Sequence, residues 1–139
     1  MTATLSTLRD LVELHLSDVG NLIFSTEMLD EAIRSALSDL SEIYGSALTL
    51  AGLDGAEETT LPEEDEHVLI VGAVAYALTF RASGRFEDAV PDQTLPDAMA
   101  DWATAHMARF KTMLAGVKER THQEADQVPY SEWEWDEDE

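Results

Sequence analysis

Two Glu-x-x-His pairs are the residues whose types and spacing come closest to a metal site. Glu64 precedes His67 by three positions, and Glu119 precedes His122 in the same way. In di-iron four-helix bundles, two helices each contribute such a pair and two others contribute a lone Glu, all pointing inward. Here the neighbours of both pairs are polar, whereas metal-binding carboxylates in a bundle need apolar packing around them. We therefore favour solvated side chains, and predict no metal, cofactor or catalytic residue.

Three further titratable residues have ordinary structural interpretations. His106 lies on an apolar helical stripe without an acid at catalytic spacing, so we expect a hydrogen-bonded structural histidine. Asp97 and Asp101 are one helical turn apart near a helix start, where an exposed acidic face suits the helix dipole. The sequence has no P-loop, dinucleotide-binding glycine pattern, nucleophile elbow or HExxH motif.

The C-terminal segment carries aromatic residues that alternate with acids. Such aromatics are typical of binding hot spots, and the alternation would also suit docking as an added strand. The segment has no core periodicity of its own, so we expect an extended or disordered tail unless a partner orders it. We interpret it as a partner-binding arm rather than an idle tail, formed by Tyr130, Trp133, Trp135, Asp136 and Glu137.

The charge of the chain is strongly negative and segregated. Its 139 residues include 29 acids and 8 bases, a formal net charge of −21, with no cysteine. Such a surface repels phosphates and acidic membranes, which argues against nucleic-acid and membrane binding. The acids concentrate in residues 54–66 and 122–139. A possible inter-subunit basic surface comprises Arg81, Arg85, Arg109, Lys111, Lys118 and Arg120.

Hydrophobic periodicity predicts a mainly α fold, a small four-helix bundle with an extended C-terminal tail. The expected helices cover residues 5–16, 26–44, 62–80 and 96–120, and Gly20 and Gly45 mark the ends of the first two. Residues 46–62 break the helical period and form either a short hairpin or an ordered loop. The third helix is apolar on every side, which predicts a central position. We divide the chain into a helical domain, 1–121, and an acidic tail, 122–139.

The fourth expected helix has one apolar stripe, and the third contains the longest apolar segment. That segment, from Val68 to Phe80, is shorter than the roughly 20 residues that span a bilayer. The start of the chain lacks the basic-then-apolar pattern of a signal peptide. The stripe of the fourth helix comprises Met99, Trp102, Ala103, His106, Phe110, Met113, Leu114 and Val117.

This order of elements resembles the head–tail connector (adaptor) proteins of long-tailed bacteriophages. The resemblance covers residues 5–120. It rests on the segments LSTLRDLV at Leu5, LDEAIRSAL at Leu29, LIVGAVAYAL at Leu69, and the last helix with Trp102-Ala103 and FKTML at Phe110. The family implies a structural virion protein without enzymatic activity. The acidic tail matches no motif of that family.

The resemblance also implies partners and a location. Members form a twelve-fold homo-oligomeric ring on the portal protein, continue the DNA channel and present a surface to the next neck or tail component. Viral DNA would pass through without specific binding, and no membrane is involved. The protein would lie at the head–tail interface of the virion and in the host cytoplasm during assembly, and Tyr130 to Glu139 would reach the portal.

An acidic protein-interaction module, for instance a DNA mimic, is the alternative function. A DNA mimic needs carboxylates spaced along a rigid face, because it has to match the phosphates that a basic site binds. In this sequence the acids cluster in a loop and a tail, which favours the connector.

Overall fold

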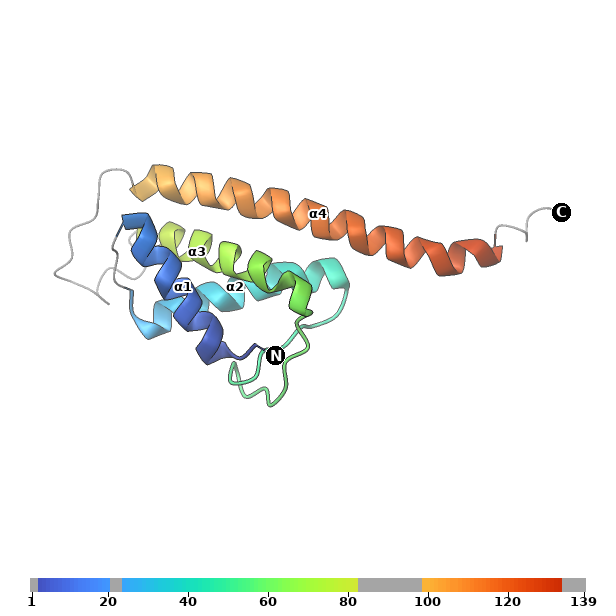
Figure 1. Ribbon diagram of the computed structural model, residues 1–139, viewed down its shortest axis with the longest axis horizontal. Coiled ribbons are helices and arrows are strands. Elements are labelled where there is room, and N and C mark those ends of the chain that lie inside the picture. Colours follow the sequence, from blue (N-terminus) through green and yellow to red (C-terminus); the bar gives the residue numbers. More distant parts are fainter. Residues whose placement is uncertain (1–2, 21–23, 83–98, 134–139) are drawn as a thin grey trace.

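The protein is mainly α-helical, as predicted. The computed structural model describes residues 3–20, 24–82 and 99–133, with the backbone alone for 18–20 and 124–133. These ranges contain four α-helices and one 3-10 turn (Figure 1). The elements are α1 (Leu5–Gly20), α2 (Thr26–Tyr44), η1 (Glu63–Asp65), α3 (Glu66–Ala82) and α4 (Met99–Trp133).

Local capping sets the ends of the first two helices. Before α1, the Thr4 hydroxyl accepts from the Thr7 N–H (3.3 Å) and the Thr7 hydroxyl accepts from the Thr4 N–H (2.9 Å), a reciprocal arrangement like a capping box. Ser25 caps α2 by accepting from the Met28 N–H at 3.2 Å. Gly45 ends α2 with a left-handed φ of 75°. The predicted bounds of α2 are confirmed.

The apolar α3 is the central helix, in agreement with the sequence. It packs against α1, α2 and α4, and its side chains are buried along most of its length. The backbones of α3 and α4 come close where Gly72 faces the ring of Phe110, which is fully buried. That ring also contacts Tyr76 edge to face, with centroids 6.1 Å apart. The absence of a side chain at Gly72 therefore lets α4 pack closely against α3.

Residues 46–62 form the ordered loop, and none of them is in a strand. The two arms of the loop meet where the Thr60 N–H donates to the Thr49 carbonyl at 3.0 Å. At the tip, Asp54 and Gly55 both have left-handed φ angles, 55° and 84°. This is the backbone of a type I′ turn, for which Asp-Gly is a preferred dipeptide.

One threonine joins the loop to the start of the chain. The Thr59 hydroxyl donates to the Ala3 carbonyl at 2.6 Å and accepts from the Ala51 N–H at 2.9 Å. The Leu5 N–H in turn donates to the Ala51 carbonyl at 3.0 Å. An isolated parallel bridge between Thr4 and Ala51 lies at the same place. The entry to α1 and the loop are thus held as one unit.

The helix α4 differs from its prediction. It continues to Trp133, so residues 122–133 are helical where an extended tail was expected, and its C-terminal part projects past the other helices (Figure 1). Extending a helix that already exists costs far less than nucleating one, and the residues after Arg120 include good helix formers. An absent core stripe does not distinguish a solvated helix from a disordered tail. Residues 134–139 lie outside the described part.

Candidate functional site

The two Glu-x-x-His pairs come to the same end of the molecule. Because α3 and α4 run antiparallel, residues near the start of α3 lie beside residues near position 120 of α4. Glu64, His67, Glu119 and His122 are all exposed. The Glu64 carboxylate lies 3.6 Å from a guanidinium nitrogen of Arg120, so its nearest charged neighbour is a cation. Nowhere in the described ranges do three or more carboxylate or imidazole groups gather as metal ligands would.

A buried polar network lies at this end of the molecule. Asp65 has no exposed surface and accepts hydrogen bonds from the Tyr44 hydroxyl and from Arg120 Nη2, which is 3.2 Å from each carboxylate oxygen. Arg120 Nη2 also donates to the Tyr44 oxygen at 2.6 Å. Burial and the hydrogen bond to Asp65 raise the pKa of Tyr44 to about 12. The network joins the end of α2, the turn η1 and α4.

The predicted basic surface is corrected at two of its members. Arg81 is only 2% exposed, and its guanidinium lies 5.3 Å from the centroid of the Phe24 ring, as in a cation–π contact. Burial lowers the pKa of Arg81. It belongs to the last turn of the central helix, which neighbouring elements enclose, so it is not available to a second subunit. Arg120 is half-buried and paired with Asp65. Arg85 lies outside the described residues.

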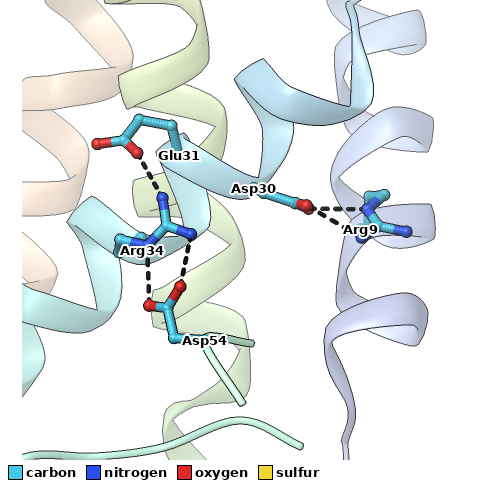
Figure 2. A network of polar contacts seen from close by, with 5 residues as sticks. All are labelled: Arg9, Asp30, Glu31, Arg34 and Asp54. Atoms are coloured by element: carbon cyan, nitrogen blue, oxygen red, sulfur yellow. Dashed lines mark hydrogen bonds and ion pairs between the residues drawn. The ribbon is translucent and has the colours of Figure 1, made fainter. Parts of the chain in front are cut away.

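Two other cations hold elements of the fold together. Arg9 on α1 donates to Asp30 on α2, with 2.8 Å between Nε and Oδ1 (Figure 2). Arg34 on α2 binds both oxygens of Asp54 in the loop, at 2.9 and 2.8 Å, and also pairs with Glu31. The hydrogen bonds from Arg34 hold the pKa of Asp54 below its usual range. The sequence did not predict the pairs Arg9–Asp30 and Arg34–Asp54. Their members are some twenty positions apart, and no spacing pattern indicates that such residues are in contact.

The remaining described cations lie exposed on α4. Arg109, Lys111 and Lys118 make no ion pair with any other residue whose placement is described. Lys111 and Lys118 are seven positions apart and so share one face of the helix, whereas Arg109 points to the opposite side. Of the predicted basic surface, these three therefore remain available to a partner.

His106 has the structural role that was predicted. Its Nδ1 lies 2.9 Å from the Trp102 carbonyl oxygen one turn earlier, and both side chains are half-buried in the α4 stripe. Asp101 is exposed in the first turn of α4, while Asp97 lies outside the described residues. The stripe itself packs as expected, with Met99, Ala103, Phe110 and Val117 buried.

The predicted partner-binding arm is helical where the structure describes it. Tyr130 and Trp133 are in the last turns of α4, so this part of the arm is not extended and is not arranged to add a strand. Trp135, Asp136 and Glu137 lie outside the described residues. The partner role of the arm stays a prediction.

Sequence reasoning also missed an apolar pair and a groove. Leu11 and Leu14 on α1 are 40% and 58% exposed, the most exposed large hydrophobic side chains of the described part. Both leucines lie outside the buried stripe of α1, so the helical spacing of the sequence could have indicated that they are exposed. A groove of about 590 Å³ lies between the end of α3 and the first half of α4. Its lining includes Ala82, Ala100, Ala103, Thr104, Met107 and Lys111.

Comparisons with family models, with curated proteins and with solved structures found no match to this chain. None of the helices in the described ranges combines the length and apolarity needed to cross a bilayer.

Proposed function

We propose that the protein is a head–tail connector subunit of a long-tailed bacteriophage, which assembles as a ring on the portal and joins the head to the neck or tail. The observation that carries the proposal is the combination of a helical body around a buried central helix with one helix, α4, that runs on past that body (Figure 1). A body that packs against neighbours and a projecting arm that reaches another component are the two parts such a subunit needs.

The length of the projecting segment suits a contact at a distance. From Arg120, the last residue tied to the buried network, to Trp133 the helix rises by about 20 Å at 1.5 Å per residue. An aromatic end on such an arm would supply anchors of the kind that dominate binding energy at interfaces. We assign Tyr130 and Trp133, with Trp135, Asp136 and Glu137 beyond them, to the contact with the portal.

The charge distribution supports passage of DNA rather than its capture. The net charge of −21 opposes binding to phosphate, and three of the described cations, Arg9, Arg34 and Arg120, are taken up by ion pairs inside the fold. A ring whose inner wall carries this charge would let the duplex slide, because no cluster of cations would hold its backbone.

The test is assembly with a candidate portal protein, sought among the genes that flank the gene of this chain. We expect the full chain to form a complex with the portal ring, measured by mass photometry and electron microscopy. A chain truncated after Gln127 should keep the helical circular dichroism of the body but lose the complex. Trp133→Ala with Trp135→Ala should weaken it, while changing the exposed loop acids Glu57 and Glu58, which lie outside the arm, to Gln serves as a control.

Two results would overturn the proposal. One is the absence of any complex with the portal at micromolar concentration under conditions in which both proteins are folded. The other is a chain that instead displaces nucleic acid from a basic DNA-binding protein, which would favour the acidic interaction module. If the chain truncated after Gln127 bound the portal with undiminished affinity, the arm would not be the portal contact, and the helical body would be the binding surface.

A further inference from the structure

The exposed leucines of α1 form a protruding apolar pair with acidic flanks. Leu11 and Leu14 are one turn apart and point away from the core stripe of their helix. Asp10 and Glu13, also exposed, lie next to them in the sequence and flank the pair. Two leucines that protrude together from one helix form a small apolar surface, and covering it with a complementary concavity would be favourable.

The groove between α3 and α4 has the opposite shape and charge. Small side chains such as Ala82, Ala100, Ala103 and Thr104 line it, which leaves room for large side chains to enter. Its charged lining residue is Lys111, on the exposed side of α4. Lys118 continues the same face two turns further along.

The charges limit which surfaces of this chain can bind a carboxylate-bearing helix. Apart from Arg109, Lys111 and Lys118, the cations of the described part are buried or already paired inside the fold. Among the described residues, the lysine face of α4 therefore combines unpaired positive charge with an apolar concavity. The acidic leucine pair of α1 matches it in both respects.

We propose that the α3–α4 groove binds the outer face of α1 from a second copy of the chain, with Leu11 and Leu14 in the groove and Asp10 and Glu13 beside Lys111. The two surfaces lie on different elements, so successive copies join head to tail, which closes into a ring when the rotation per subunit allows it. The closure into a ring rests on the proposed connector function; the contact itself rests on the residues named here.

Cross-linking tests the contact directly, because the sequence has no cysteine and every introduced thiol is unique. Copies carrying Leu14→Cys are mixed with copies carrying Thr104→Cys and treated with a short bismaleimide. We expect cross-linked dimers at least fivefold above the yield with Ala105→Cys, an exposed position on the other side of α4. Equal yields with the two partners would overturn the proposal.

A single chain carrying both Leu14→Cys and Thr104→Cys tests the direction of assembly. A head-to-tail contact gives a ladder of covalent multimers on a denaturing gel, because each copy has one donor and one acceptor surface. A product that stops at the dimer would show two-fold pairing instead and would refute the head-to-tail arrangement.

Charge reversal tests the electrostatic part with a matched control. Lys111→Glu should weaken self-association, measured by sedimentation velocity, by about tenfold, a typical loss for reversing one charge of an interfacial pair. Arg109→Glu makes the same charge change two residues away on the opposite side of α4 and should change association less than twofold. Mixing Lys111→Glu copies with Glu13→Lys copies should restore it. Equal losses for both variants, or no restoration, would contradict the contact.

The outcomes separate this interface from the connector function. Suppose that the portal complex forms, but Leu14→Cys cross-links equally to Thr104→Cys and Ala105→Cys, and Lys111→Glu weakens association no more than Arg109→Glu. The α1–groove contact is then wrong, while the connector proposal stands. If the cross-links and the charge rescue behave as expected but no portal binds, self-association stands and the connector proposal fails. All substituted positions are exposed, so each variant should keep the thermal midpoint of the original protein.

Discussion

The contact between Gly72 and Phe110 allows a quantitative test of the packing between α3 and α4. A Cβ added at Gly72 would lie 2.4, 2.5 and 2.8 Å from three carbons of the Phe110 ring. Carbon atoms normally approach to roughly 3.5–4.0 Å, so the ring or the helix must shift by about 1 Å. The ring has no free space to move into, because it is fully buried and lies against Tyr76.

The expected effect of Gly72→Ala is a balance of two contributions. Overpacking a core of this kind costs typically 1–3 kcal/mol, while Ala stabilises a helix interior by roughly 1 kcal/mol relative to Gly. An overlap of about 1 Å with a buried ring places this substitution in the upper half of the overpacking range, so we expect the free energy of unfolding to fall by about 1–2 kcal/mol in urea denaturation. Gly116→Ala on α4 is the matched control, since nothing lies within 4 Å of its added Cβ, and it should raise that free energy by roughly 0.5–1 kcal/mol.

A double-mutant cycle shows whether the clash is the cause. Phe110→Leu removes the ring, so adding Gly72→Ala to it should cost nothing or stabilise the protein, with a coupling energy of about 1 kcal/mol or more. If Gly72→Ala is neutral or stabilising in the original protein, or costs as much in the Phe110→Leu background, the described packing of α3 against α4 is wrong.

Three further predictions concern the polar contacts. Asp65→Asn should lower the free energy of unfolding by roughly 1–3 kcal/mol, because it removes the buried carboxylate that accepts from Tyr44 and Arg120, although Glu64 stays 3.6 Å from Arg120; a loss below 1 kcal/mol in urea denaturation would count against the network. Burial raises the pKa of both Tyr44 and Tyr76 to about 12 from an ordinary 10, so the folded state holds these protons more tightly than the unfolded state does. Stability is then fully present below pH 10 and falls as the pH rises from 10 to 12, and replacing both tyrosines by Phe should flatten that fall in thermal scans. Ser25→Ala should cost about 1 kcal/mol through loss of the α2 cap, and Ser25→Gly only a few tenths, in the same denaturation assay.

The parts of the fold that local sequence determines were predictable. The bounds of α2 follow from Ser25 and Gly45, since a hydroxyl before the first turn and a glycine after the last act through neighbouring backbone groups alone. The central place of α3 follows from its apolar residues on every side. The mainly α class follows from these same patterns, which is why it was predicted and is observed.

The missed features depend on contacts between distant residues. Asp65 belongs to a run of acids that reads as solvated, and only the packing of α4 brings Arg120 against it. Arg81 reads as a surface cation until neighbouring elements enclose the end of α3. The continuation of α4 to Trp133 is decided by a small difference in free energy between a solvated helix and a coil, which residue spacing does not reveal.

The hydrogen bonds of Thr59 have a consequence for how the protein opens. Its hydroxyl joins Ala3 to the loop across 56 positions of sequence. The start of the chain and the loop can therefore separate only when the hydrogen bonds of Thr59 break. The amide protons of Leu5 and Ala51 should therefore exchange with solvent together, as one cooperative unit. Because such a long-range contact forms only after the intervening helices have docked, this corner is expected to fold late and to open early.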